Sequence, residues 1–482
     1  MQPPGQACRD ASLAHEKPPF RGFYTLYTLT QVPRYGPCSV RILPIRSTGI
    51  SPRSFLHPNS GKARPEVQLL HFADLHLGIE NYGRIDPVTG LHTRLLDFRG
   101  CLESIFDAAI EGQVDAVLFA GDLYRTPTPN PTWQREFAVQ LRRLQQADIP
   151  IVLVVGNHDT PVAFGRATSV DVFNALDLTA THVVRTPRLF TLTTKSGPLQ
   201  IAGLPWPTRH YLRADDTYKQ LSQEDMLRQI SRLCARQIRD FAERLEPDTP
   251  SVLVAHVAAA GALLSGSERT ALIGADPTLL TSDLANPAFD YVALGHVHRH
   301  QDLNPGGMPA VVYSGSVERV DFGEERETKG FCSICIDVQG GRRTTSYEFI
   351  STPARPFVTI DVDVTGDDEP TAAILKAIGR SNLRDAILRV RYSAAAGQRI
   401  DTAAIRRALG ESGVHHVAII APNITPRERQ RRSAVPQDAG TGFALERFID
   451  NRPDLQPHRE DLRRYAVQLE RDLTLDARGD DS

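Results

Sequence analysis

The sequence predicts an α/β (α+β) fold, and three features of its pattern support that class. Short apolar runs each stop at a polar cluster, as buried strands do. Between some of these runs, apolar residues recur three and four positions apart, which predicts amphipathic helices. After about Ser351 a second alternation of strands and helices begins. We therefore expect a sheet layered by helices on both sides, followed by a smaller domain.

The first domain is expected to span residues 67–350. Helices are indicated by the apolar residues between Leu95 and Ile110 and by those between Met226 and Phe241. Buried strands are indicated at Val67 to Ala73, Val114 to Ala120, Ile151 to Val155, Val252 to Ala255 and Tyr291 to Leu294.

A small α+β capping domain is expected at 355–422, where three strand patterns alternate with two helical ones. An Arg-rich linker at 423–440 separates it from a C-terminal helical tail at 441–475. The tail carries two short amphipathic stripes, around Phe448 and Tyr465, and neither can bury its apolar side alone. The stripes either pack back onto their own domain or bind a partner.

Residues 1–66 differ from the rest in composition. They hold ten of the 34 Pro, and nine Lys+Arg against three Asp+Glu. Such Pro-punctuated sequence without sustained periodicity indicates either a disordered extension or a misassigned translation start. No Met occurs between Met1 and Met226, so a start near Val67 would need a non-Met codon.

The charge balance argues against a protein that holds nucleic acid mainly by its own electrostatics. The 482 residues carry 55 Lys+Arg and 57 Asp+Glu, whereas domains of that class have a clear basic excess. Six scattered Cys and the lack of an 18-residue apolar run or a signal-peptide pattern favour a cytoplasmic protein. The single C-x-x-C pair, Cys332 and Cys335, lies in an expected strand and lacks the second pair of a structural zinc site.

Five polar clusters each follow an apolar run directly. In an open α/β sheet the ligand site lies beyond the carboxyl ends of the strands, so these distant segments are expected to converge. They supply carboxylate, imidazole and amide donors without thiolate, a set that suits Mn, Fe or Zn. The clusters are Asp74-Leu75-His76, Gly121-Asp122, Gly156-Asn157-His158-Asp159, His256, and Gly295-His296-Val297-His298.

The number of donors indicates two metal ions. Seven candidate ligands exceed what one ion takes but fit two ions that share one carboxylate, for which Asp122 is our candidate. Two cations about 3.5 to 4 Å apart clamp a phosphate and activate a hydroxide. His158 is the candidate for an uncoordinated imidazole that steadies phosphoryl oxygens or protonates the leaving alkoxide. His300 either supports the site from outside or is a solvated loop residue.

The ordered motifs resemble the calcineurin-like metallophosphoesterase superfamily, which implies a two-sheet β sandwich flanked by helices with a dimetal site at the strand ends. Longer motifs are similar to those of the SbcD-type nucleases, the nuclease subunits of SbcCD DNA-repair complexes. These motifs are FADLHLG (72–78), GDLYRTPTPNP (121–131), GNHD (156–159), GSER (266–269), DYVALGHVH (290–298), YSGSVERVDFGE (313–324) and KGF (329–331).

The resemblance implies a division of the donors between two divalent ions per chain, with manganese as the expected metal. The catalytic histidine of the family falls on His158. One ion would take Asp74, His76, Asp122 and His298, and the other would take the same Asp122 with Asn157, His256 and His296.

The resemblance also implies an activity and partners. Family members act as double-strand exonucleases and single-strand endonucleases in DNA repair, recombination and replication. They work as dimers with an SMC-like ATPase, SbcC, that grips C-terminal helices of the nuclease. We therefore expect a nucleoid-associated protein with DNA and an SbcC-like ATPase as partners and no membrane contact.

Three further residues are candidates for substrate binding. Related nucleases carry Asp or His after GDLY, where this chain has Arg125; Arg cannot ligate a metal but can hold a phosphate oxygen. Ser316 and Arg319 lie in a polar, Gly-rich motif that could present N–H groups and a guanidinium to the DNA backbone. The alternatives are a solvated loop residue for Arg125 and a turn that stabilises the last strand for the motif.

Two other functions stay open at this point. A small-molecule phosphodiesterase or phosphatase could use the same fold, because fold and dimetal site alone do not choose a substrate. It would have an enclosed pocket in place of an open groove. A non-catalytic binding module is the third reading, and the presence of a donor at every ligand position argues against it.

Overall fold

The computed structural model describes residues 66–161, 166–176, 178–208, 221–266, 276–339, 341–395, 397–423, 445–446, 449–450 and 455–468. The chain divides into two units, Met1–Pro58 and Asn59–Ser482, and the first lies wholly outside the described residues. The extension or alternative start expected at 1–66 lies outside them except for Glu66, which begins the first strand. Most of the Arg-rich linker and much of the helical tail also lie outside the described residues. Among the described residues, no helix is long and apolar enough to span a membrane.

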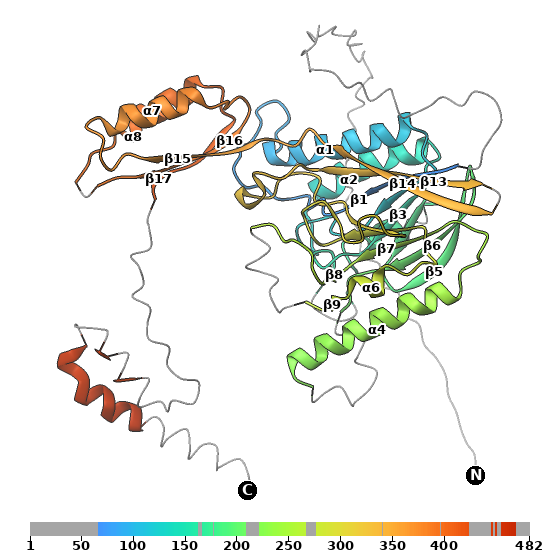
Figure 1. The fold of residues 1–482 in the computed structure, drawn as a ribbon. Helices are drawn as coiled ribbons and strands as arrows, with labels where there is room; N and C mark the ends of the chain where they lie inside the picture. Colours follow the sequence, from blue (N-terminus) through green and yellow to red (C-terminus); the bar gives the residue numbers. More distant parts are fainter. Residues whose placement is uncertain are drawn as a thin grey trace, which may run out of the picture. The chain divides into compact units, whose positions relative to one another are not determined.

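Two six-stranded sheets form the centre of the first domain (Figure 1). The first has the order β14-β13-β1-β2-β3-β4 and the second β11-β12-β10-β7-β6-β5. Strands β1 to β4 are parallel. Strand β13 pairs antiparallel with β1, and β14 pairs antiparallel with β13. The strands of the first sheet are β1 (Glu66–Phe72), β2 (Ala116–Phe119), β3 (Ile151–Val154), β4 (Thr181–Val184), β13 (Gly330–Gln339) and β14 (Arg342–Ser351).

The second sheet is parallel in its middle, where β6, β7, β10 and β12 lie side by side, and antiparallel at both edges. Its strands are β5 (Arg188–Thr194), β6 (Gly197–Leu204), β7 (Ser251–His256), β10 (Tyr291–Gly295), β11 (Gln301–Asp302) and β12 (Ala310–Tyr313).

One buried apolar layer joins the two sheets. Leu69, Leu118 and Val152 of the first sheet belong to the same core cluster as Val254 and Ala293 of the second. Side chains alternate along a strand, so Leu70, next to Leu69, packs on the opposite face of its sheet. Each sheet is therefore buried on both faces, which explains the nearly continuous apolar runs in the sequence.

Helices cover the outer face of each sheet. Helices α1 (Thr93–Glu111) and α2 (Pro131–Gln146) lie on one side of the stacked sheets, and α4 (Gln223–Glu243) lies on the other (Figure 1). The predicted sandwich of two sheets flanked by helices is thus confirmed. Helix α2 is not among the expected elements, although three of its five buried side chains are apolar and lie at helical spacing: Phe137, Leu141 and Leu144.

The chain after residue 355 forms a separate parallel sheet with its own core. The order β15-β16-β17 is joined by two helices that pack with the strands in one apolar cluster. A 3-10 turn, η5 (Gln456–His458), and a helix over 459–468 belong to the expected tail. The elements of this sheet are β15 (Phe357–Asp363), α7 (Pro370–Arg380), β16 (Ile387–Ser393), α8 (Thr402–Glu411) and β17 (His416–Pro422).

Candidate metal centre

The five polar clusters meet where five strands end. Strands β1, β2 and β3 are neighbours in the first sheet, and β7 and β10 are neighbours in the second, so the donors come from both layers of the sandwich. The structure brings together all eight residues proposed for metal binding and catalysis: Asp74, His76, Asp122, Asn157, His158, His256, His296 and His298.

Four of these residues hold a backbone conformation that side chains other than glycine rarely adopt. The φ angles are 52° at Asp74, 47° at His76, 62° at Asp122 and 103° at His296. Such conformations cost about 1 to 3 kcal/mol each and concentrate at functional sites. Backbone hydrogen bonds stabilise them: Asp74 N–H donates to Gly121 O at 2.9 Å, and His76 N–H donates to Asp122 O at 3.0 Å.

Two glycines of the motifs are required by close packing at the site. A Cβ on Gly121 would lie 2.2 Å from Nδ1 of His256, and a Cβ on Gly156 would lie 2.1 Å from Oδ1 of Asp122. Neither neighbour is free to move, because both are buried among the other donors. This explains why the Asp122 and Asn157 clusters each begin with glycine.

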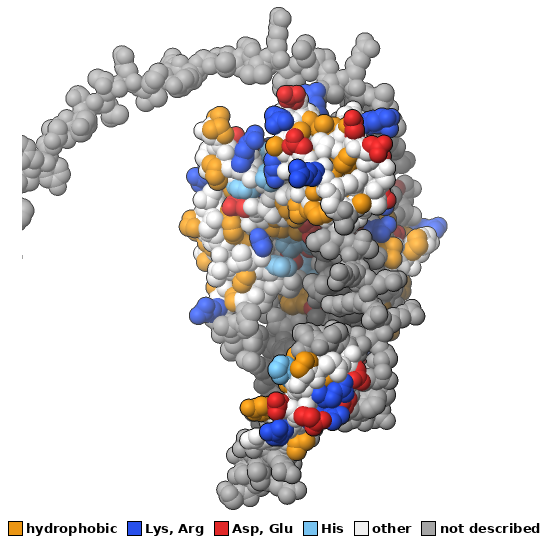
Figure 2. Space-filling model, turned by 90° about the vertical axis from the view of Figure 1, so that its left-hand side faces the viewer, with side chains coloured by type: hydrophobic (Ala, Val, Ile, Leu, Met, Phe, Trp, Pro, Cys, Tyr) orange, Lys and Arg blue, Asp and Glu red, His pale blue; other side chains and the backbone are white. Residues whose placement is uncertain are grey.

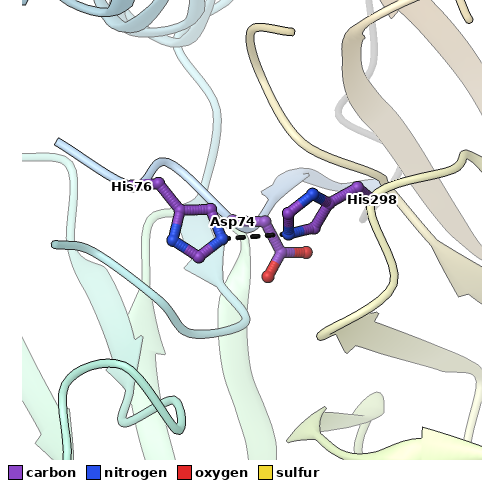
Figure 3. A group of neighbouring side chains, drawn as sticks. All are labelled: Asp74, His76 and His298. Carbon is purple, nitrogen blue, oxygen red and sulfur yellow. Dashed lines mark hydrogen bonds between the residues drawn. The ribbon is translucent and has the colours of Figure 1, made fainter. Parts of the chain in front are cut away.

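The first donor group consists of Asp74, His76 and His298, whose ligand atoms lie within 4.8 Å of one another. Figure 3 shows the two imidazoles converging near the Asp74 carboxylate, with Nε2 of His76 3.0 Å from Nε2 of His298. Burial lowers the pKa of His76 well below its ordinary value, which favours the neutral ring that a metal requires. Burial also raises the pKa of Asp74, to about 6.

The second donor group surrounds Asn157. Its Oδ1 lies 2.9 Å from Nε2 of His256 and 3.1 Å from Nδ1 of His296. Nδ1 of His256 donates to Ala120 O at 2.7 Å, which leaves Nε2 facing the group. Burial opposes protonation of His256, but the Asp122 carboxylate prevails and raises its pKa to about 9. The metal-free site therefore attracts positive charge.

Asp122 links the two groups. Its Oδ2 lies 3.8 Å from Nε2 of His76 and 3.4 Å from Nε2 of His256, while Oδ1 accepts the N–H of His158 at 2.8 Å. Burial would raise the pKa of Asp122, but His256 and His76 outweigh it and hold the carboxylate ionised. Converging nitrogen and oxygen donors that share one anionic carboxylate fit two divalent cations.

Residues 67–300 match the family of the calcineurin-like phosphoesterases. These residues form a calcineurin-like metallophosphoesterase domain. A curated relative, the D subunit of nuclease SbcCD from Bacillus subtilis (strain 168), is 27% identical over 294 residues, which cover 61% of this chain and 71% of the relative. With the donor set described above, the chain is a metal-dependent phosphodiester hydrolase.

Two solved structures are also similar to the chain. A dimetal phosphatase from Danio rerio is 10% identical, with a TM-score of 0.31, over 59% of this chain and 99% of that protein. The protein TT1561 from Thermus thermophilus is 14% identical, with a TM-score of 0.29, over 58% of this chain and 98% of that protein.

Two buried carboxylates bond to the residues and loops that carry the metal donors. Asp159 accepts the N–H groups of Asp122 at 3.0 Å and of Gly156 at 3.1 Å, and so ties the loop after β2 to the loop after β3. Glu324 accepts from Nδ1 of His298 at 2.7 Å. The sequence pattern assigns no role to either acid. The only signal for them is their place in the GNHD and YSGSVERVDFGE motifs.

His158 differs from the donors in being exposed. Its Nδ1 lies 3.0 Å from the carbonyl oxygen of Arg125. Because a carbonyl only accepts, Nδ1 carries the proton, and Nε2 is the nitrogen left for a substrate. The ring also lies edge-on to His76, with centroids 4.9 Å apart. His158 thus adjoins the first donor group while a backbone contact fixes its orientation.

The three residues expected to bind substrate fall into two classes. Arg125 is exposed beside His158. The hydroxyl of Ser316 is buried against Glu318 O at 3.1 Å and Glu324 Oε2 at 3.3 Å. The guanidinium of Arg319 donates to Glu327 O at 2.7 Å and Arg355 O at 3.1 Å. These contacts correct the expectation for Ser316 and Arg319, because both polar groups are used within the chain.

His300 takes no part in either donor group. Its ring stacks on Phe349 with centroids 4.0 Å apart, and Nδ1 donates to Tyr313 O at 2.9 Å. It is therefore neither the solvated histidine nor the outer support that the sequence left open.

Proposed function

We propose that the protein is a DNA nuclease, the D subunit of an SbcCD-like complex. The observation that carries this proposal is the pair of donor groups joined by Asp122, with His158 beside them and oriented through the Arg125 carbonyl. The curated relative, which is named as a nuclease subunit, supports DNA as the substrate. We infer double-strand exonuclease and single-strand endonuclease activity in DNA repair, recombination and replication.

The donors named above would hold the two ions, for which we propose Mn²⁺. When bound, such a pair polarises a phosphoryl oxygen and lowers the pKa of water, so that hydroxide is supplied near neutral pH. In its imidazolium form, with a proton on each ring nitrogen, His158 would donate the Nε2 proton to the leaving oxygen, while Nδ1–H stays bonded to the Arg125 carbonyl and the ring becomes neutral. The Arg125 side chain is exposed next to it, where it can hold a phosphate oxygen.

The charge distribution supports a partner that contributes to DNA binding. Acidic and basic side chains are interspersed on the face drawn in Figure 2, in keeping with the net charge of −2. Duplex DNA is held mainly by clustered positive charge. We infer an SbcC-like SMC-family ATPase partner, a homodimer of this chain, and action in the cytoplasm at the nucleoid.

A small-molecule phosphodiesterase would need a pocket that encloses the donors. A cavity of about 550 Å³ is lined by Pro127, Thr128, Ser169 and Ala175 among others, and its lining includes none of the eight site residues. That cavity therefore does not support the hypothesis of a small-molecule phosphodiesterase.

Cleavage of end-labelled duplex DNA tests the proposal. Metal-stripped protein reconstituted with Mn²⁺ is assayed with and without the ATPase. It is expected to degrade the DNA when the ATPase is present, and His158→Ala is expected to lose this activity. Bis-nitrophenyl phosphate serves as the control substrate. Hydrolysis of that diester without DNA cleavage, even with the ATPase present, would overturn the nuclease proposal and leave the phosphodiesterase.

A further inference from the structure

Glu324 is a fully buried carboxylate at the edge of the metal centre. It lies in the 3-10 turn η4 (Phe322–Glu324) and is 0% exposed. One oxygen accepts from Nδ1 of His298 at 2.7 Å, and the other accepts from Nζ of Lys329 at 2.8 Å and from the N–H of Val320 at 2.9 Å. Burial would raise its pKa, but Lys329 and His298 outweigh it and keep the carboxylate ionised.

Pairing with Lys329 does not by itself account for Glu324. The ammonium of Lys329 also contacts Glu327 Oε2 at 2.9 Å and donates to the carbonyl of His298 at 3.0 Å. Lys329 therefore has an anionic partner without Glu324. A buried ion pair often contributes no net stability over apolar residues, and the Val320 N–H and the Ser316 hydroxyl are neutral donors that need no charged acceptor. The contact with His298 is therefore the one for which a function is sought.

The contact with Glu324 fixes which nitrogen of His298 faces the donors. A carboxylate accepts, so Nδ1 carries the proton and Nε2 offers its lone pair toward His76 and Asp74. Lys329 holds the backbone carbonyl of the same histidine. The side chain and the main chain of His298 are thus both bonded to one buried ion pair.

We infer that Glu324 is a positioning residue for the metal centre, which holds His298 in the tautomer and orientation that binds the first ion, with Lys329 keeping Glu324 in place. This inference rests on the proposed metal site. Carboxylates that accept from a ligand histidine raise metal affinity by about tenfold to a hundredfold.

Titration of metal-free protein with Mn²⁺ by calorimetry tests the inference directly. Glu324→Gln is expected to weaken one of two binding events by about tenfold to a hundredfold and to leave the other unchanged. Glu325→Gln is the matched control, because Glu325 occupies the next position but bonds to Thr359, away from His298. Equal Mn²⁺ affinity in Glu324→Gln and wild type would overturn the inference, while absence of Mn²⁺ binding in wild type would overturn the proposed function.

A double variant separates positioning from a structural role. Glu324→Gln with Lys329→Met removes both charges of the fully buried pair, a change that cores often tolerate. Glu327, which also contacts Lys329, is partly exposed to solvent. We expect thermal stability to recover relative to Glu324→Gln alone, while Mn²⁺ affinity stays low. Recovery of both properties together would mean that Glu324 acts only through the stability of the fold.

Discussion

At the scale of single residues, His158 stands apart from the metal donors because it is exposed and is held through the Arg125 carbonyl. Because Nδ1 of His158 bonds to a backbone carbonyl and not to a metal donor, Nε2 is the nitrogen available for proton transfer. Removal of the His158 side chain is therefore expected to leave metal binding intact.

His158→Ala is expected to lower kcat about a hundredfold to ten-thousandfold, since it removes a proton donor and leaves the seven donors intact. Metal content, measured on the same preparation, is expected to stay at two ions per chain. The matched control is His458→Ala, which removes another exposed histidine and is expected to leave kcat unchanged. Loss of metal in His158→Ala would contradict the assignment.

Another prediction at this scale concerns His71, which is buried in β1 between Tyr291 OH and Leu294 O, each 3.2 Å from a ring nitrogen. Burial lowers its pKa from 6.5 to about 3. The unfolded chain therefore binds the proton first, so stability is fully present above pH 6.5 and is lost as the pH falls toward 3.

The loss from His71 amounts to at most roughly 5 kcal/mol. Urea unfolding of metal-free protein at pH 7 and pH 4 measures it. His71→Gln keeps a polar side chain but does not titrate, so the variant is expected to lose less stability between the two pH values. An equal loss in both proteins would contradict the lowered pKa of His71 in the folded chain.

At the scale of elements, the loops after β2 and β3 behave as one piece because Asp159 bonds to both. Its carboxylate accepts from the N–H groups of Asp122, Leu123 and Gly156 and from the Ser169 hydroxyl. Asp122 and Asn157, which these loops carry, belong to the two donor groups. The spacing between the loops is thus set by a residue that contacts no donor side chain.

Asp159→Asn is expected to lower the free energy of unfolding by about 2 kcal/mol, because an amide cannot accept from all of these donors. It is also expected to weaken Mn²⁺ binding. Asp115→Asn is the matched control, since Asp115 is a buried acid that accepts the N–H groups of Gln68 and Ser196 at a distance from the donors. The control should lose stability but not metal affinity, and an equal effect on metal affinity would contradict the proposed role of Asp159.

At the scale of the whole molecule, hydrolysis and partner binding are assigned to separate parts of the chain. All eight site residues lie between 74 and 298, whereas the tail begins after the capping sheet. In the described part of the tail, Tyr465 is 67% exposed and Val467 is 51% exposed. These apolar groups fit a partner-binding role.

Deletion of 441–482 is therefore expected to spare hydrolysis of bis-nitrophenyl phosphate and to abolish association with the ATPase. Pull-down of the ATPase by the shortened and full chains measures the association, and the diester assay on the same samples verifies the fold. Unchanged pull-down by the shortened chain would place the interface elsewhere.

The site could be predicted to the extent that it depends on local pattern. Asp74, Asp122 and His256 follow apolar runs, and residues at the carboxyl ends of buried strands share one edge of the sheet. Glu324 could not be found in this way, since its contact with His298 spans 26 residues and depends on how η4 packs. The burial of Ser316 could not be predicted either, because it depends on tertiary packing.

The sequence by itself determined the five strands that end at the donors, the two larger helices of the first domain and the identity of the donors, because hydrophobic periodicity and residue chemistry are local properties. Only the tertiary structure decided which nitrogen of His158 faces outward, which buried acids support the donors, and that Ser316 and Arg319 serve the chain itself. Those outcomes depend on burial and on partners distant in sequence, and both exist only once the two sheets have packed together.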